Sequence, residues 1–307
     1  MANAEIAILM CTYNGERFLS EQLASFVWQS HGNWKLWISD DGSSDRTLKI
    51  AEEFAKRYPD RLGGIFQGPS QNHAANFLSL VSRSEIQADY YAFSDQDDIW
   101  HEDKLERSLQ FLGGQNAEIP MLYCGRTRIV DEQNQEVGLS PLFSKKPSFA
   151  NALVQSIGGG NTMVFNNRTR ELLRIAGPNL AVTHDWWAYI VVSGCGGLVF
   201  YDREPALRYR QHSNNVIGVN SSWSGRIARF RMLLNGRFRD WNDANIKSLQ
   251  PLLDYLTPES RRTLQEFQSA RDAGLIQSLL KLKECGVYRQ TLFGNLSLLG
   301  AAILRKI

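Results

Sequence analysis

The run Tyr90-Tyr91-Ala92-Phe93-Ser94-Asp95-Gln96-Asp97-Asp98-Ile99-Trp100 sets three carboxylates directly after an apolar, aromatic segment. The apolar segment predicts a buried strand, and a carboxylate buried without a partner is strongly destabilising. We therefore expect the carboxylates to lie where the strand ends and to face a cation. Carboxylate oxygens suit Mg²⁺ or Mn²⁺, and such an ion would hold a phosphate group. The alternative is a polar turn before a helix that begins near residues 101–103.

Two strand-turn-helix units precede this segment. Residues 5–11 predict a short buried strand and residues 12–16 the turn that follows it. Residues 34–39 predict a second strand, which leads into Asp40-Asp41-Gly42-Ser43 and an amphipathic helix. Successive units of this kind predict a parallel sheet, so both turns would open at the same edge as Asp95. Carboxylates at this edge could bind a base or a ribose, or they could simply form a turn and a helix cap.

Four motifs, in this order, make the chain resemble the inverting glycosyltransferases of family 2, which have the nucleotide-sugar-binding GT-A fold. They are Thr12-Tyr13-Asn14-Gly15-Glu16, Asp40-Asp41-Gly42-Ser43, Asp95-Gln96-Asp97-Asp98-Ile99-Trp100 at the position of the family's D-x-D motif, and His184-Asp185-Trp186-Trp187. The resemblance covers about residues 4–215. It implies an α/β fold with a central mixed sheet flanked by helices, and we expect a C-terminal helical extension. No Gly-rich phosphate loop is present, which argues against kinases and P-loop enzymes.

The resemblance also implies roles for individual side chains. The nucleotide-sugar pocket would be formed by Thr12, Tyr13, Glu16, Asp40, Asp95 and Arg210. Asp40 would contact the base and Asp95 would lie near the ribose. Asp97 would bind the divalent cation. Asp98 is a weaker candidate for a sugar or acceptor contact, because a carboxylate at a helix start is also favoured by the helix dipole.

His184-Asp185-Trp186-Trp187 contains the candidate catalytic base. In the family that this chain resembles, an Asp or Glu at the position of Asp185 takes a proton from the acceptor hydroxyl during a single displacement. Asp185 could also cap the helix that follows, and the two roles are compatible. Trp186 and Trp187 could stack on sugar faces, although one of two adjacent aromatic residues on a helix should face the core.

Two further segments supply candidates. Gly158-Gly159-Gly160-Asn161 stands just before an expected strand, where it would form a wall of the sugar or acceptor pocket or a structural bend. Residues 198–202 and 206–210 predict two strands. Arg210 and His212 would then point to the same face of an extended segment. Arg210 suits a diphosphate and His212 suits the metal ion, although a single histidine is more often structural.

Several motifs are also similar to bacterial rhamnosyltransferases that build lipopolysaccharide or cell-wall polysaccharide. They are residues 14–23, Asn76-Phe77, residues 184–187 and residues 209–215. Such enzymes use dTDP-β-L-rhamnose and form an α linkage by inversion, and Asn76 thereby becomes a candidate sugar contact. His73-Ala74-Ala75 stands where a glycine-containing turn is expected, which leaves the donor open. We expect a metal-dependent hexosyltransferase whose acceptor is a saccharide or a lipid-linked saccharide.

Three alternatives remain open. The enzyme could use another UDP-hexose or dTDP-hexose as donor. A sugar-nucleotide nucleotidyltransferase would be expected to carry a Gly-rich, basic phosphate loop after its first strand, and residues 12–16 do not form one. A non-catalytic protein that binds glycans or nucleotide sugars would bind the donor without releasing nucleoside diphosphate.

Composition predicts one large core and a smaller appendage. The chain has 307 residues, 43% of them hydrophobic and 21% charged. We expect a catalytic domain at residues 1–215 and a basic, mainly helical extension at residues 216–307. The extension has 14 Lys or Arg and 7 Asp or Glu, a net charge of +7. Residues 1–215 carry −5, so the whole chain has a net charge of +2.

The extension suggests a membrane partner. Residues 223–241 mix five arginines with aromatic and aliphatic residues. Such a helix would lie on anionic headgroups or pack on the catalytic domain. Residues 288–307 are apolar but too short and interrupted for a membrane span, so they would lie in an interface or pack as a core helix. The acidic catalytic half and a pI near 8.3 argue against nucleic acid as a partner.

The N-terminal sequence and the cysteine spacing predict where the protein is located and whether its thiols are free. The chain enters a strand almost at once, so we expect no secretory signal and a cytoplasmic enzyme, in peripheral contact with the inner face of the membrane. The cysteines are widely spaced and show no pattern of metal ligands, so we expect free thiols. They are Cys11, Cys124, Cys195 and Cys285.

Overall fold

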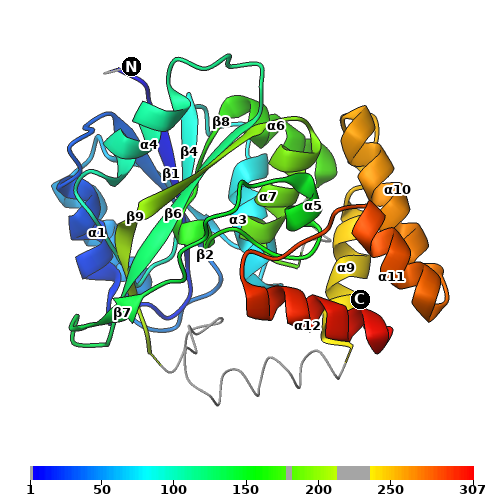
Figure 1. The fold of residues 1–307 in the computed structure, drawn as a ribbon. Helices are drawn as coiled ribbons and strands as arrows, with labels where there is room; N and C mark the ends of the chain where they lie inside the picture. The colour runs from blue at the N-terminus through cyan, green and yellow to red at the C-terminus, as the bar shows by residue number, and fades with distance from the viewer. Residues whose placement is uncertain (1–2, 178–181, 213–235) are drawn as a thin grey trace.

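The computed structural model describes residues 3–177, 182–212 and 236–307 (Figure 1). Its centre is a mixed sheet with the strand order β3-β2-β1-β4-β8-β6-β9-β5, and β7 pairs with β6. The strands are β1 (Ile6–Thr12), β2 (Trp34–Asp40), β3 (Leu62–Gln67), β4 (Tyr90–Ser94), β5 (Ile99–Trp100), β6 (Met121–Val130), β7 (Glu136–Leu139), β8 (Val164–Asn166) and β9 (Leu198–Arg210).

The first part of the sheet is parallel. β1 pairs with β2 and β4, and β2 pairs with β3, all in parallel. The connections carry α1 (Leu19–Val27), α2 (Thr47–Arg57) and α3 (His73–Ser82). The strand-turn-helix prediction is thereby confirmed. Because the strands run in the same direction, the turn after β1, the turn after β2 and the carboxylates after β4 open at one edge of the sheet.

The second part of the sheet is mixed. β8 runs antiparallel to β4 and β6, β9 runs parallel to β6, and the short β5 pairs antiparallel with β9. The expectation of two strands at residues 198–202 and 206–210 is wrong, because β9 is continuous. Its pairing with β6 shifts in register on either side of Arg126. The two predicted strands are therefore the two parts of one strand that this irregularity separates.

Both faces of the sheet are covered by helices. α1, α2 and α4 (Lys104–Leu112) pack on one face, where they bury Ile6, Ile8 and Met10 of β1. α3, α6 (Asn167–Ala176) and α7 (His184–Gly194) pack on the other face, against Ala7 and Leu9. Successive side chains of β1 therefore enter opposite cores, which explains its continuous apolar sequence.

The C-terminal helices pack beside α7 (Figure 1). They are α9 (Arg237–Ser248), α10 (Pro258–Asp272), α11 (Leu275–Glu284) and α12 (Leu292–Ile303), with the short α5 (Phe149–Ala152) packed against α7 and α10. Phe238, Phe267 and Leu298 belong to the same hydrophobic core as α7. The expected helical extension is thereby confirmed. The boundary predicted at residue 215 falls outside the described residues.

Two other expectations bear on the extension and the thiols. Most of the segment 223–241 lies outside the described residues, so its arginine-rich part has no structural account here. Within the described ranges, no helix combines the length and apolarity that crossing a bilayer requires. All four cysteines are free thiols, as expected.

Candidate active site

Asp40 joins the ends of β1 and β2. Its Oδ1 accepts hydrogen bonds from Thr12 Oγ1 at 2.7 Å and from Ser43 Oγ at 2.6 Å. Its Oδ2 accepts from the backbone N–H groups of Gly42 at 3.1 Å and Ser43 at 2.8 Å. Gly42 has φ of 89°, which suits glycine. The buried carboxylate is therefore engaged by the turn, and its contact with a base stays a prediction.

Asp41 is a candidate that the sequence analysis missed. It is partly exposed at the same edge, and its Oδ1 accepts from the backbone N–H of Ser70 at 2.8 Å. The pKa of the nearby Cys11 thiol is raised by burial and by the charges of Asp95 and Asp41. The signal was in the sequence, since alternation along a strand sends one member of an Asp-Asp pair away from the other.

The turn after β1 is held against the carboxylate loop by Gln96, the middle residue of the D-x-D motif. The backbone N–H of Tyr13 donates to Gln96 Oε1 at 2.9 Å, and Gln96 Nε2 donates to the carbonyl of Tyr13 at 2.9 Å. A Cβ on Gly15 would lie 2.2 Å from Gln96 Oε1, so a larger residue would displace the Gln96 amide from these two hydrogen bonds. The Tyr13 side chain is 59% exposed and available to a ligand. Gln96 is a second residue that sequence analysis missed.

Glu16 links the turns after β1 and β2. Its backbone N–H donates to Asp45 Oδ2 at 3.0 Å, and its Oε2 accepts from the backbone N–H of Arg46 at 3.0 Å. These contacts bring the three turn residues expected near the nucleotide, Thr12, Tyr13 and Glu16, to the same edge.

Asp95, directly after β4, lies within electrostatic reach of Asp97 and of Asp185 on α7. Burial and the charges of Asp97 and Asp185 raise the pKa of Asp95 to about 7. His212 Nε2 lies 2.8 Å from Asp97 Oδ2, so the two residues expected to share a metal ion do lie together. The charges of Asp97 and Asp185, from two distant parts of the chain, thus both act on Asp95, and the roles of these carboxylates stay predictions.

Asp185 lies in the first turn of α7 and is partly exposed. Its Oδ1 accepts from the backbone N–H of Trp186 at 2.7 Å. Trp186 and Trp187 are both buried in the core, and a contact of either side chain with a sugar stays a prediction. Trp186 Nε1 donates to the carbonyl of Ala152 at 2.6 Å, which accounts for the polar atom of the indole.

His184 packs beneath Asp185. Its ring stacks on Phe77 with centroids 3.9 Å apart and meets the edge of Phe93 at 4.7 Å. Neither ring nitrogen has a hydrogen-bond partner among the described residues, and burial holds the pKa of His184 well below its usual range. A Cβ on Gly160 would lie 2.1 Å from His184 Nε2. Close packing thus explains this glycine, which was expected either to line a pocket or to form a bend.

The comparison with known proteins agrees with this geometry. The sequence model named Glycosyl transferase family 2 matches residues 7–193. The chain belongs to glycosyltransferase family 2.

One curated relative of this glycosyltransferase is the dTDP-rhamnosyl transferase RfbG of Shigella flexneri. The two are 32% identical over 247 residues, which cover 75% of this chain and 81% of the relative. The solved structures that match are more distant. S. aureus TarS 1-349 in complex with UDP-GlcNAc has a TM-score of 0.53 at 13% identity, covering 98% of this chain and 89% of the other.

A second solved structure is the mannosyltransferase PcManGT from Pyrobaculum calidifontis in complex with GDP-Man and Mn²⁺. It has a TM-score of 0.52 at 14% identity and covers 99% of this chain and 86% of the other. At such identities these likenesses show the fold of the glycosyltransferase, which is GT-A.

Some expected contacts of the glycosyltransferase lie beneath the surface. Asp98 is fully buried, with Oδ2 accepting from Asn161 Nδ2 at 2.6 Å and Oδ1 from the backbone N–H of Arg210 at 3.3 Å. The carbonyl of Asn161 accepts from the buried Lys104 Nζ at 2.6 Å. Asn76 is also buried, and its Nδ2 donates to the carbonyl of Ser39 at 3.2 Å. A sugar or acceptor contact for these side chains stays a prediction.

Arg210 is buried and lies on the same side as His212, as expected, since both side chains contact Phe18 and Asp97. Its side chain is 1% exposed. Nε donates to the carbonyl of Asp97 at 3.1 Å, Nη1 to the carbonyl of Glu132 at 2.9 Å, and Nη2 to Glu21 Oε2 at 2.7 Å. The guanidinium therefore holds the backbone of the carboxylate loop, and its contact with a diphosphate stays a prediction.

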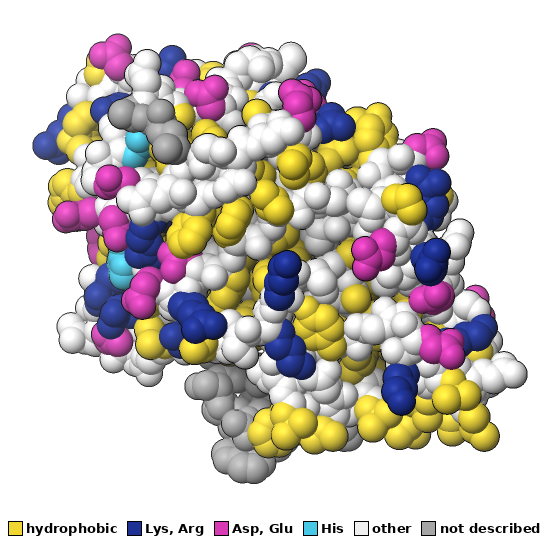
Figure 2. Space-filling model, turned by 45° about the horizontal axis from the view of Figure 1, so that its top comes forward, with side chains coloured by type: hydrophobic (Ala, Val, Ile, Leu, Met, Phe, Trp, Pro, Cys, Tyr) yellow, Lys and Arg dark blue, Asp and Glu magenta, His cyan; other side chains and the backbone are white. Residues whose placement is uncertain are grey.

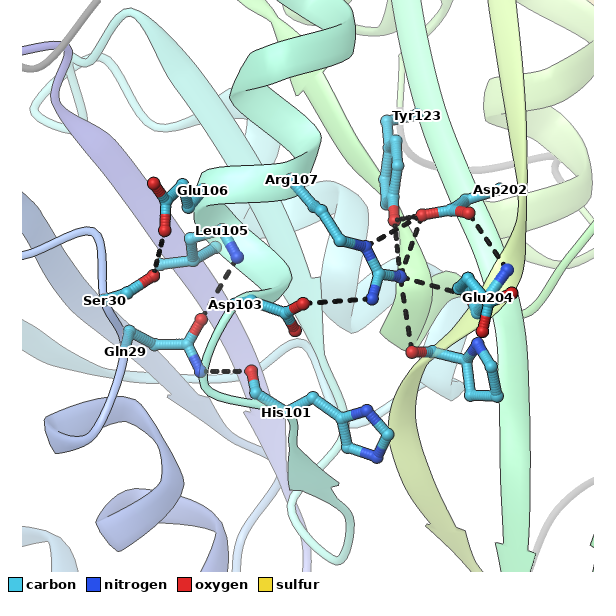
Figure 3. A network of polar contacts seen from close by, with 11 residues as sticks. Gln29, Ser30, His101, Asp103, Leu105, Glu106, Arg107, Tyr123, Asp202 and Glu204 are labelled. Carbon is cyan, nitrogen blue, oxygen red and sulfur yellow. Dashed lines mark hydrogen bonds and ion pairs between the residues drawn. The ribbon is translucent and has the colours of Figure 1, made fainter.

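The segment after the carboxylates is anchored on both sides (Figure 3). Gln29 Nε2 donates to the carbonyl of His101 at 2.8 Å. On the other side, Arg107 Nε donates to Asp202 Oδ2 at 2.9 Å, and Tyr123 Oη donates to the same oxygen at 2.7 Å (Figure 3). The carboxylate loop thus leaves β4 and enters α4 between two fixed points.

The residues at the edge fit a divalent cation. In the parts of the chain that the structure describes, no group of three or more His, Cys, Asp or Glu side chains is gathered to hold a metal ion. Asp97 and His212 nevertheless offer an oxygen and a nitrogen at one point. The pKa of Asp95 is raised mainly by burial and further by the negative charges of Asp97 and Asp185. A cation held there would offset the repulsion among these carboxylates.

Proposed function

We propose that this glycosyltransferase transfers L-rhamnose, with inversion, from dTDP-β-L-rhamnose to a saccharide acceptor of a bacterial surface polysaccharide or lipopolysaccharide. The observation that carries the reaction type is the match to glycosyltransferase family 2, and the charges of Asp97 and Asp185 acting on Asp95 at the edge of the sheet support it. The choice of donor is supported by the relative named as a dTDP-rhamnosyl transferase.

The nucleotide would lie over the turns after β1 and β2. The exposed ring of Tyr13 would stack on the base. Thymine carries an imide N–H, and the partly exposed carboxylate of Asp41 is better placed to accept it than that of Asp40, which the turn already engages. Asp95 would accept a ribose hydroxyl.

Asp97 and His212 would hold the divalent cation, Mg²⁺ or Mn²⁺. Such an ion supplies positive charge to the departing diphosphate. Arg210 contributes by fixing the carbonyl of Asp97, which keeps the carboxylate loop in place.

Asp185 would act as the base. The acceptor oxygen attacks the anomeric carbon opposite the diphosphate, so that the new C–O bond forms as the bond to the phosphate oxygen breaks. The hydroxyl proton passes to the Asp185 carboxylate. The backbone N–H of Trp186 holds Oδ1, and this contact fixes the direction of the second oxygen. The packed ring of His184 fixes the start of the helix.

Substitution of Asp185 by Asn tests the assignment. The amide oxygen can still accept from Trp186 N–H but the side chain cannot take a proton, so turnover should fall by about 10²-fold or more while donor affinity changes little. The matched control is Asp60→Asn, which alters an exposed carboxylate outside the site. Near-normal turnover of Asp185→Asn would exclude it as the base.

Calorimetric titration tests the donor. dTDP-L-rhamnose, UDP-glucose and UDP-N-acetylglucosamine would each be titrated with Mn²⁺, with Mg²⁺ and with a chelator. Metal-dependent selectivity for the dTDP sugar is the expected result. Preference for a UDP sugar would keep the reaction and overturn the donor, and binding without nucleotide release in the presence of acceptor would favour a non-catalytic binder.

A further inference from the structure

Helix α12 presents an apolar face to solvent. Leu292, Leu296, Leu299 and Ile303 recur at intervals of three or four residues and are 74%, 54%, 47% and 49% exposed. The opposite side of the helix packs on the protein through Leu298, Ala301 and Ala302. The helix has no charged residue. A surface helix that faces only water normally carries polar side chains on its outer face, so this face is incomplete without a partner.

Helix α11 extends the apolar face. It packs against α12, and its Ile276 and Leu280 are 75% and 57% exposed. Phe293, next to Leu292, is 74% exposed. Figure 2 shows hydrophobic side chains gathered along the lower edge of the molecule, with Lys and Arg side chains nearby. We use the term C-terminal apolar face for Ile276, Leu280, Leu292, Phe293, Leu296, Leu299 and Ile303.

The segment that carries the C-terminal apolar face is basic. Residues 275–307 contain five Lys or Arg and one Glu, a net charge of +4. Lys283 is exposed on α11, and Arg305 is exposed directly after α12. Aliphatic side chains bordered by Lys and Arg are the pattern of a surface that enters the headgroup region of an anionic bilayer.

We propose that the C-terminal apolar face docks on a membrane that contains anionic lipids. The competing occupant is a second copy of the chain, and the charge argues against it. Two copies meeting through this face would bring two segments of +4 together, whereas anionic headgroups would neutralise each of them.

The C-terminal apolar face is tied to the catalytic part of the chain. Between α11 and α12, the carbonyl of Tyr288 accepts from Asn151 Nδ2 at 2.8 Å, and Gln290 Oε1 accepts from the backbone N–H of Lys145 at 3.1 Å. In Figure 1 α12 and the end of β9, which leads to His212, lie on the same lower side of the molecule. With this face on a membrane, the proposed active site would open towards the bilayer. That orientation suits an acceptor carried on a lipid, an inference that rests on the proposed function.

Vesicle co-sedimentation tests the proposal. The full chain would be mixed with vesicles of phosphatidylglycerol and phosphatidylethanolamine, or of phosphatidylcholine alone. We expect binding to the anionic vesicles, and the double variant Leu296→Gln, Leu299→Gln should bind at least about tenfold more weakly, because two exposed leucines no longer enter the bilayer. The matched control is Leu48→Gln, Ile175→Gln, which changes two exposed aliphatic residues on α2 and α6.

Two further measurements separate the outcomes. Lys283→Gln, Arg305→Gln should weaken binding to anionic vesicles and remove most of its salt dependence. Donor binding by the leucine variant should equal that of the wild type, so a failure of the membrane proposal is distinguishable from a failure of the proposed function. Absent vesicle binding, or equal binding by the leucine and control variants, would overturn the proposal. A dimer in sedimentation velocity that only the leucine variant loses would identify a second copy instead.

Discussion

Substitution of Gly160 by Ala should disturb the catalytic helix through His184. The new Cβ would lie 2.1 Å from His184 Nε2, far inside van der Waals contact. The ring cannot easily move away, because Phe77 stacks on one side of it at 3.9 Å and Phe93 meets it at 4.7 Å. Overpacking of this kind costs about 1–3 kcal/mol of unfolding free energy.

The substitution should also lower turnover. His184 begins α7 and Asp185 is the next residue, so a displaced ring moves the proposed base. A shift of about 1 Å can cost up to about 10²-fold in rate, and we expect at least a tenfold loss with donor affinity nearly unchanged. The assays are urea unfolding, calorimetric donor binding and release of nucleoside diphosphate.

A double-mutant cycle decides whether the mechanism is right. His184→Ala alone leaves a cavity, but it also makes room for the Cβ, so Gly160→Ala should cost at least about 1 kcal/mol less in that background than in the wild type. Gly32→Ala is the matched control, because a Cβ there meets nothing within 4 Å. Equal costs of Gly160→Ala in the two backgrounds, or no difference between Gly160→Ala and Gly32→Ala, would refute the reasoning.

Three further predictions concern the metal ion, pH and a buried lysine. Asp97→Ala should remove the metal-dependent part of donor affinity, and an unchanged Mn²⁺ titration would contradict its role. Burial lowers the pKa of His184 in the folded state, so the free energy of unfolding should fall as the pH drops below 6.5. In urea unfolding, the decrease in this free energy between pH 7.5 and pH 5.5 should be smaller for His184→Asn than for the wild type, by up to about 1.4 kcal/mol. Lys104→Met should lower the free energy of unfolding by on the order of 3 kcal/mol, because the buried carboxylate of Asp98 and the carbonyl of Asn161 lose the ammonium group near them. A decrease below about 1 kcal/mol would show that neither group depends on Lys104.

The sequence was most informative about elements defined by local pattern. The apolar run of β1 and the carboxylates after β4 predicted a parallel sheet with an acidic edge, and the resemblance to family 2 named the fold. These features depend on strand direction and on residue type, which a linear pattern records.

Side-chain orientation was harder to predict, because it depends on partners distant in sequence. Arg210 turns inward because the carbonyls of Asp97 and Glu132 are there to accept its donors. Trp186 is buried in the core that α7 shares with the C-terminal helices, and the carbonyl of Ala152 accepts from its indole. Asp40 and Asp41 are adjacent and chemically identical; alternation separates their directions, but which of them the turn engages depends on the donors of the folded turn.

The amide of Gln96 would couple the binding of the nucleotide base to the binding of the metal ion. Through two hydrogen bonds it makes the Tyr13 turn and the Asp95–Asp97 loop a single mechanical unit. An ion that orders the loop would therefore also order the platform for the base, and the base would return the effect by the same factor, since coupling free energies are reciprocal. Selectivity for the nucleotide and affinity for the metal would then have evolved as one property rather than two.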